Sequence, residues 1–311
     1  MHNLEQYDAV DITGEVIDVR NALGIPDEVN IKGKDYRVHP PHQVVVFAQL
    51  PDLYTSVVDD WSHVSSDSQG GHILPTGDTF KPVYAEAGRR KTKLSPLLTR
   101  RDFSNLDEVW QIKEADVNMS ETYIVYRNTM FVEPLGLSEE QCIIPDGKTD
   151  TPHQEVVIFE RKLAGKTWDL AMLGIGPDET TIDGRIISAS PHIGFIPRGT
   201  PPDQTAMFVQ LDEGTLFANS RRAPDPDHFF THAITQGPAD IGRAERHLLV
   251  ATGAKKMNNI RDVLFGPVNM DIPATHVLLY PETTIVLDTL AATLVRSQIA
   301  ELPRRHVFPV I

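Results

Sequence analysis

Short apolar runs alternate along the chain with stretches in which apolar and polar residues recur at helical spacing. Runs rich in Val, Ile and Leu and nearly free of charge are typical of parallel strands, which are buried on both faces. The strand-like runs of this kind are 44–47, 72–74, 170–173 and 248–251. A further strand is expected at 106–112, although it carries two acids, and helical patterns cover 51–61 and 120–131. This alternation predicts an α/β fold, a mainly parallel sheet with helices on both faces, of a modified Rossmann-like kind.

The first 40 residues follow a different pattern. Two β-like runs, Ala9–Val19 and Val29–Val38, carry turn signals at Thr13-Gly14 and Lys32-Gly33. We interpret residues 1–40 as a β-arm or extension and residues 41–311 as a single α/β domain. The arm would serve packing or subunit contact, which leaves a homo-oligomer open.

Composition narrows the classes of partner. The chain has 311 residues, 41% of them apolar, and a net charge of −14. An acidic protein is a poor match for nucleic acid and for anionic membranes, because both need a basic face. No apolar run approaches the roughly 18 residues of a membrane span, and the N-terminus shows no export signal. We therefore expect a cytoplasmic protein. Its one cysteine, Cys142, excludes an internal disulfide and is interpreted as a packing residue.

The run Leu170–Leu173 is followed at once by Gly174-Ile175-Gly176-Pro177-Asp178. Ligands of open α/β sheets bind at the carboxyl ends of the strands. Two glycines there allow the backbone to bend and approach a ligand closely, and Asp178 follows the strand end as a candidate carboxylate. An ordinary turn between strand and loop is the alternative.

A second strand end carries the turn Thr76-Gly77-Asp78-Thr79. Such a turn presents backbone N–H groups and a helix N-terminus to an anion, so it can hold phosphate without net positive charge. We expect the Asp78 side chain to face solvent, because a carboxylate turned inward would repel phosphate. The alternative is a helix N-cap formed by Thr76 or Asp78. The basic residues at 89–93 and 100–101 are expected at solvated helix ends and loops.

These two turns resemble those of the glucosamine-6-phosphate deaminase family, a group related to 6-phosphogluconolactonases and ribose-5-phosphate isomerases. The family's central strand ends in Gly-x-Gly-x-Asp-Gly-His-Ile-(Ala/Gly)-Phe-Asn-Glu-Pro. This chain has the glycines, Asp178 and, after an insert, His192-Ile193-Gly194-Phe195-Ile196-Pro197. Its Leu-Pro-Thr-Gly-Asp-Thr is similar to the family's phosphate loop, Leu-Pro-Thr-Gly-Gly-Thr-Pro. The resemblance spans roughly residues 44–295 and implies an α/β fold of the deaminase/isomerase type.

Besides Asp78, which stands in place of the second Gly of the family's phosphate loop, the chain departs from the family pattern at three places. The insert before His192 contains a second half-match, Asp183-Gly184-Arg185-Ile186, and Ile196 stands where the family has Glu. The family's Asn-Met-Asp-Glu-Tyr contains the acid that moves a proton between neighbouring sugar carbons. The aligned residues place Lys113 at that acid and keep Glu114 beside it. A protonated lysine is a poor general base, so this replacement bears directly on the reaction.

The resemblance implies an enzyme that acts on a hexose or amino-hexose 6-phosphate as isomerase or deaminase. His192 would assist opening of the sugar ring, Asp178 would orient or support it, and Glu114 is the best remaining group for the proton transfer. Two alternatives stay open. One is a 6-phosphogluconolactonase-type hydrolase, and the other is a sugar-phosphate-binding protein without catalysis.

The resemblance also implies the ligands of the phosphate. Besides Thr76, Gly77, Asp78 and Thr79, these are Arg221, which falls on the Arg of the family's Ala-Asn-Ser-Arg, and Lys256, which follows the strand-like run 248–251. No cofactor and no metal are expected. His39 and His42 are held apart from any other ligand by two prolines, and the resemblance places His232, four residues after His228, at the start of a strand.

Overall fold

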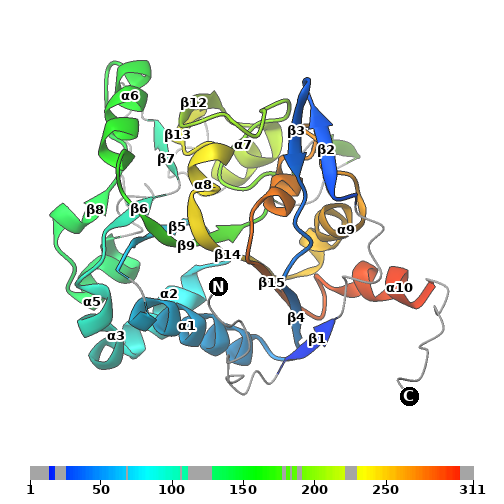
Figure 1. Cartoon of the computed structure of the whole chain (residues 1–311), viewed down its shortest axis with the longest axis horizontal. Coiled ribbons are helices and arrows are strands. Elements are labelled where there is room, and N and C mark those ends of the chain that lie inside the picture. Colours follow the sequence, from blue (N-terminus) through cyan, green and yellow to red (C-terminus); the bar gives the residue numbers. More distant parts are fainter. Residues whose placement is uncertain are drawn as a thin grey trace.

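The computed structural model describes residues 14–17, 26–67, 69–105, 107–110, 128–176, 180–182, 184–187, 191–220 and 230–301. Eight of the described strands form the central sheet (Figure 1). In hydrogen-bonded order they are β1 (Glu15–Ile17), β4 (Gln43–Phe47), β15 (Thr283–Asp288), β14 (Ala244–Ala251), β9 (Trp168–Gly174), β5 (Gly71–Leu74), β6 (Phe103–Asn105) and β8 (Cys142–Ile143). Every pairing is parallel except that of β1 with β4. The predicted mainly parallel sheet is confirmed.

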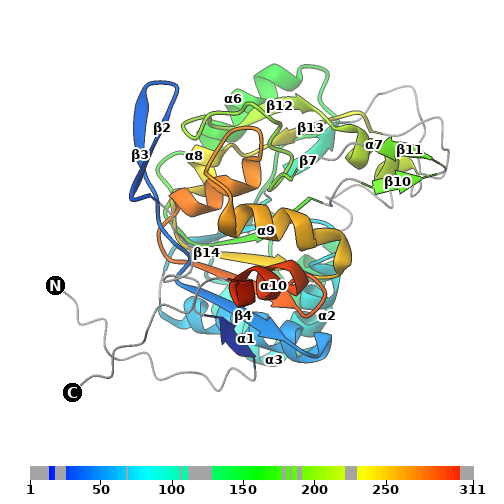
Figure 2. The same cartoon turned by 90° about the vertical axis from the view of Figure 1, so that its right-hand side faces the viewer.

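Helices cover both faces of this sheet. The helices of the described chain are α1 (Leu50–Asp67), α2 (Lys81–Arg89), α3 (Lys91–Leu98), α5 (Glu133–Leu135), α6 (Pro152–Leu163), α7 (Glu213–Ser220), α8 (Pro238–Ile241), α9 (Met257–Phe265) and α10 (Thr293–Glu301), of which α7 lies beside β11 and not on the central sheet. Shorter helical turns are η1 (Asn128–Val132), η2 (Glu139–Gln141), η3 (Ala254–Lys256) and η4 (Pro273–Leu279). Figure 2 shows α1 and α3 below the strands and α9 above them.

The two faces of the sheet carry separate cores because successive strand residues point to opposite sides. On β9, Leu170 and Met172 pack with α1, α2 and α3, whereas Ala171 and Leu173 pack with α6, α9 and η4. Each of these four side chains is at most 3% exposed. A strand buried on both faces favours apolar residues on both sides, and the run Leu170–Leu173 is the pattern that identified this strand in the sequence.

Part of the predicted N-terminal arm joins this framework. β1 extends the central sheet at β4, and β2 (Glu28–Ile31) and β3 (Lys34–Arg37) form the hairpin expected from the second β-like run. Its turn is at Lys32-Gly33, both with positive φ, where the Asn30 side chain accepts a hydrogen bond from the Gly33 N–H. Residues 1–13 and 18–25 lie outside the described residues.

The chain also forms a second, antiparallel sheet. It consists of β12 (Met207–Gln210), β13 (His232–Thr235) and β7 (Asp107–Trp110). The strand predicted at 106–112 is confirmed at 107–110 as β7, and the strand expected to start at His232 is confirmed as β13. β7 is not a strand of the parallel sheet, since it pairs antiparallel with β13, whereas β6, which ends at Asn105, lies in the central sheet. Four-residue strands carry too little periodicity for the sequence to assign them to a sheet. The insert adds a hairpin of β10 (Thr180–Ile182) and β11 (Arg185–Ile187).

One basic residue expected in solvent is buried. Arg101 is 3% exposed, and its guanidinium pairs with Asp169 at 3.2 Å and donates to the carbonyls of Ser65 and Gly70. The prediction of a solvated pair at 100–101 is wrong for Arg101, because a carboxylate and two carbonyls replace the water that the charge gives up. Among the described helices, none is long and apolar enough to cross a membrane.

Candidate functional site

The glycine turn after β9 lies at the carboxyl end of the central strand. Gly174 pairs across the sheet with Val250, near the carboxyl end of β14. The Gly176 N–H then donates to the His192 carbonyl at 2.7 Å, which closes the loop of the insert back onto the strand end. His192 is therefore held at the strand ends, as the resemblance implied. Asp178 lies outside the described residues.

The turn of Thr76 to Thr79 follows the neighbouring strand β5. Gly77 has φ +122°, a conformation that residues with a Cβ rarely adopt, so this turn requires glycine. The Asp78 side chain is 54% exposed and pairs with Lys81 at 2.9 Å, so it faces solvent as expected. A helix cap by Thr76 or Asp78 is wrong, since α2 begins after Phe80 and has no side-chain cap.

The two turns lie against each other. A Cβ built on Gly174 would stand 3.8 Å from the ring of Phe80, the residue that ends the Thr76 turn. On the far side of Phe80, Tyr84 donates its hydroxyl to the Pro75 carbonyl at 2.6 Å. A buried aromatic and a hydrogen bond thus fix the position of the Thr76 turn beside β9.

Lys256 reaches the same place from the end of β14. Its amine donates to the Ile175 carbonyl at 2.5 Å, in the middle of the glycine turn. The loop that carries it is held by Asp288 at the end of β15, since both carboxylate oxygens accept from the Gly253 N–H at 3.0 Å. The sequence singled out Lys256 but not Asp288. Asp288 is the last residue of β15, and a carboxylate at a strand end can accept hydrogen bonds from the N–H groups of a neighbouring loop.

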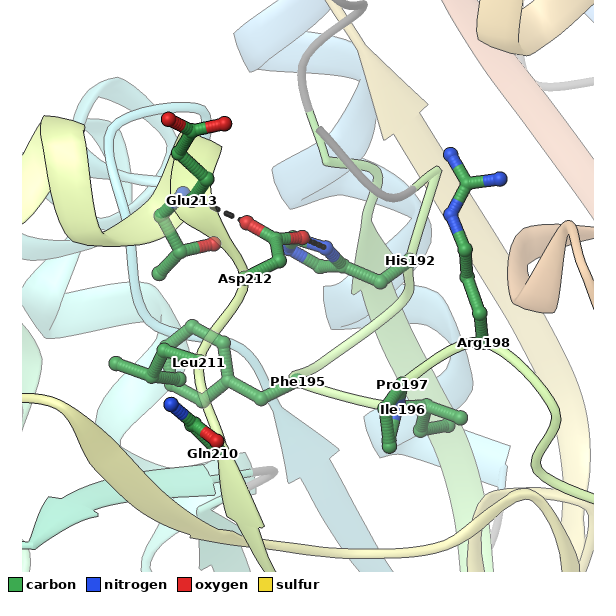
Figure 3. A pocket seen from close by; sticks show the side chains of 10 residues that line it. His192, Phe195, Ile196, Pro197, Arg198, Gln210, Leu211, Asp212 and Glu213 are labelled. Carbon is green, nitrogen blue, oxygen red and sulfur yellow. Dashed lines mark hydrogen bonds and ion pairs between the residues drawn. The ribbon is translucent and has the colours of Figure 1, made fainter. Parts of the chain in front are cut away.

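A cavity of about 340 Å³ opens beside His192 (Figure 3). Two segments line it, and their residues are His192, Phe195, Ile196, Pro197, Arg198, Gln210, Leu211, Asp212, Glu213 and Thr215. Within it, the Nδ1 atom of His192 lies 3.3 Å from an oxygen of Asp212, with side chains 12% and 26% exposed. The sequence analysis missed Asp212. The sequence offers one sign of its position: Asp212 stands directly before Glu213, the first residue of α7, and an Asp at this place is typical of a helix N-cap.

Several residues singled out by the sequence fall on positions that the structure does not describe: Lys113, Glu114, Asp178 and Arg221, as well as Asp183 of the second half-match. The structure brings together His192, Lys256 and the turn 76–79 around the glycine turn. Their common position follows from β5, β9 and β14 being adjacent and parallel. The described residues include no group of His, Cys, Asp or Glu that could hold a metal ion.

Comparison with known proteins adds relatives over most of the chain. No model of a known protein family matches it. A glucosamine-6-phosphate deaminase of Bacillus cereus (strain G9842) is 31% identical over 237 residues, which is 76% of this chain and 82% of the relative. A glucosamine-6-phosphate deaminase of Bacillus thuringiensis (strain Al Hakam) matches with the same identity and coverage.

Solved structures show the same fold. A monomeric glucosamine-6-phosphate deaminase superposes with a TM-score of 0.70 and 26% identity, over 81% of this chain and 99% of that chain. The 6-phosphogluconolactonase of Trypanosoma brucei has a TM-score of 0.62 at 15% identity, over 83% of this chain and 99% of that one. At such low identity the second similarity concerns the fold alone.

Proposed function

Because the chain belongs to the glucosamine-6-phosphate deaminase family, as the sequence resemblance indicated, we propose that it acts on a hexose or amino-hexose 6-phosphate. The observation that carries the proposal is the meeting of three groups at one end of the sheet. These are the turn 76–79, the amine of Lys256, which donates to the glycine turn, and His192, whose backbone carbonyl accepts from the same turn.

The phosphate is proposed to lie against the turn 76–79. The backbone N–H groups of this turn offer hydrogen bonds, and Gly77, which has positive φ, carries no Cβ that would stand in the way of a ligand. The ammonium of Lys256, set at the neighbouring strand end, adds a positive charge beside this turn, and Arg221 would add a second. A local site of this kind is compatible with a net charge of −14.

Ring opening is assigned to His192. With Nδ1 directed at Asp212, its Nε2 is the nitrogen that can exchange a proton with the sugar ring oxygen and the anomeric hydroxyl. Opening exposes an aldehyde at C1, which acidifies the C2 proton. Transfer of that proton between C2 and C1 gives the isomer and, when C2 carries an amine, allows loss of ammonia.

The proton transfer itself is assigned to Glu114, with Lys113 beside it. A lysine ammonium has no lone pair at neutral pH, so it cannot take the carbon-bound proton, although its charge would stabilise an enediolate. The carboxylate of Glu114 is the nearest group in sequence that can accept it.

A second candidate, lactone hydrolysis, is favoured by the same replacement. Attack of water on a 6-phosphogluconolactone needs a base such as His192 paired with Asp212, and it needs no carboxylate at position 113.

The test is a panel of phosphorylated sugars assayed for turnover and for thermal shift. It contains glucosamine 6-phosphate, fructose 6-phosphate with ammonia, glucose 6-phosphate and 6-phosphogluconolactone. We expect turnover of an amino-sugar or hexose phosphate, and a rate in His192→Ala lower by about 10²–10⁴-fold with little change in thermal shift. Thermal shifts without turnover of any compound would contradict catalysis, and turnover of the lactone alone would select the second candidate.

A further inference from the structure

We propose that Asp212 is the positioning residue of His192: its carboxylate holds the Nδ1–H of the imidazole and leaves Nε2 to meet the substrate. The inference rests on the proposed function in so far as His192 is the group that exchanges protons with the sugar. Asp212 lies outside the motif that identified His192, on a different element and 20 positions later in the chain.

The first observation is the contact itself. Figure 3 shows the carboxylate of Asp212 facing the His192 ring, with the ion pair drawn between them. The distance of 3.3 Å from Nδ1 to the carboxylate oxygen is that of an ion pair, just beyond the usual range of an N–H···O hydrogen bond. Both side chains are mostly shielded from solvent, so the pair is less weakened by water than a surface pair.

The second observation is that Asp212 is itself fixed. Its other carboxylate oxygen accepts from the Thr215 N–H at 2.7 Å, in the first turn of α7. Its carbonyl accepts from the Leu216 N–H at 2.9 Å, and the preceding Leu211 N–H donates to the Thr231 carbonyl at 2.9 Å. The carboxylate therefore caps a helix with one oxygen and holds the histidine with the other.

The third observation is that His192 is held from its own side. Its carbonyl accepts from Gly176, and the ring of Phe195 lies 6.1 Å from the imidazole centroid. The motif that follows His192 offers no carboxylate of its own in the described chain, since Ile196, where the family has Glu, is fully buried. The backbone of the glycine turn and the carboxylate of Asp212 together fix the ring.

The other charged groups that line this cavity are Arg198 and Glu213. The Glu213 carboxylate is engaged by the guanidinium of Arg185 on β11. Among the described residues, the carboxylate that faces Nδ1 of His192 is that of Asp212. A carboxylate only accepts hydrogen bonds, so the neutral ring carries its proton on Nδ1 and leaves the lone pair on Nε2.

Asp212→Asn separates this role from a purely structural one. Asparagine caps helices as well as aspartate does, so the variant keeps the bond to Thr215 and its melting temperature should stay within a few degrees. With the amide oxygen on Thr215, the NH₂ group faces Nδ1 as a donor. Nδ1 must then lose its proton, and the neutral ring changes to the Nε2–H tautomer.

The experiment is ¹⁵N NMR of histidine-labelled full-length protein, with the His192 signals assigned by His192→Gln. We expect the parent to show neutral His192 protonated at Nδ1, Asp212→Asn to show it protonated at Nε2, and Asp203→Asn to match the parent. Asp203 is an exposed carboxylate paired with Lys34 outside the cavity, and it serves as the control. A parent protonated at Nε2, or a tautomer unchanged in Asp212→Asn, would overturn the proposal.

Turnover gives the second readout. In Asp212→Asn we expect kcat to fall by about 10²–10⁴-fold with KM within about threefold of the parent, because a misplaced proton affects the reaction rather than ground-state binding. A kcat equal to that of the parent would also overturn the role. If the parent turns over none of the sugar phosphates, the proposed function fails, while the tautomers of parent and variant still decide the role of Asp212.

Discussion

Lys113 is the residue whose proposed role most affects the type of reaction expected. The resemblance aligns Lys113 with the acid of the related deaminase motif, and an ammonium in that place could not accept a proton from carbon at neutral pH. We therefore expect the parent to release ammonia from glucosamine 6-phosphate slowly, and Lys113→Asp to release it at least about tenfold faster. Coupled detection of ammonia measures both rates.

Two matched variants define the outcome at this position. Lys113→Met removes the charge without supplying a base and should not raise the rate, and Glu114→Gln should lower the residual rate of the parent. Fast release by the parent that survives both changes would mean that neither residue takes part in the proton transfer.

Asp60 is a carboxyl whose burial opposes folding at neutral pH. Burial in α1, reinforced by the neighbouring Asp59, raises the pKa of Asp60 from 3.8 to about 6. The folded protein thus binds the proton more tightly than the unfolded chain. Asp60 does not affect the free energy of unfolding below about pH 4. Between about pH 4 and 6 the free energy of unfolding falls as pH rises, and above about pH 6 the whole reduction is present.

Asp60→Asn should remove that cost. Two pKa units correspond to about 3 kcal/mol, so we expect the free energy of unfolding to rise by about 1–3 kcal/mol at pH 7.5 and to be unchanged near pH 4. Urea unfolding at the two pH values measures it. The control is Asp52→Asn in the first turn of the same helix, where loss of an acid should slightly lower stability. An equal gain from both variants, or the same gain at both pH values, would refute the assignment to Asp60.

Among the elements, the turn after β5 offers a direct test of phosphate binding. Gly77 has φ +122°, and nothing lies within 4 Å of the place where a Cβ would stand. In Gly77→Ala the space is available but the backbone conformation is not, so the turn must shift and the N–H groups must move with it. We expect binding of a sugar phosphate to weaken at least about tenfold.

Gly165→Ala is the matched control, since Gly165 also has positive φ with open space around it and lies after α6, away from the proposed phosphate. Both variants should lose about 1 kcal/mol of stability, as read from urea unfolding. Only Gly77→Ala should lose affinity, as read by calorimetry. An equal loss of affinity in both would mean that the turn 76–79 does not bind the phosphate.

The elements that the sequence predicted well are those with a pattern on every residue. The strands β4, β9 and β15 each contain an apolar run of three or four residues because helices cover both faces, and the glycine turn follows β9 directly. Two strands of the three-stranded sheet, β7 and β13, were expected from the sequence, but their pairing was not, because each strand has four residues and the pairing depends on contacts distant in sequence.

The site was predictable only where chemistry and position coincide in one motif. His192 and Lys256 follow strand ends in sequence, so the topology of a parallel sheet brings them together. Asp212 follows a short strand of the other sheet, and only the folded chain shows that its carboxylate meets His192.

In the molecule as a whole, the parallel order of β5, β9, β14 and β15 gathers four loops at one edge of the sheet. These loops come from segments up to about 210 residues apart in the sequence. They are the backbone turn 76–79, the glycine turn with His192, the loop of Lys256 and the end of β15, where the Asp288 carboxylate holds the loop of Lys256. We propose that an anionic ligand binds at these carboxyl ends of the strands, although the protein as a whole is acidic.

The most direct measurement is the binding of glucosamine 6-phosphate and of glucosamine by titration calorimetry, in the parent and in Lys256→Ala. We expect the parent to bind the phosphorylated sugar and not glucosamine. Lys256→Ala should weaken binding by about 1.5–3 kcal/mol, the value of a hydrogen bond to a charged group, which is about ten- to a hundredfold in Kd. Equal affinity of the parent for both sugars, or undiminished binding by Lys256→Ala, would contradict a phosphate site at the carboxyl ends of the strands.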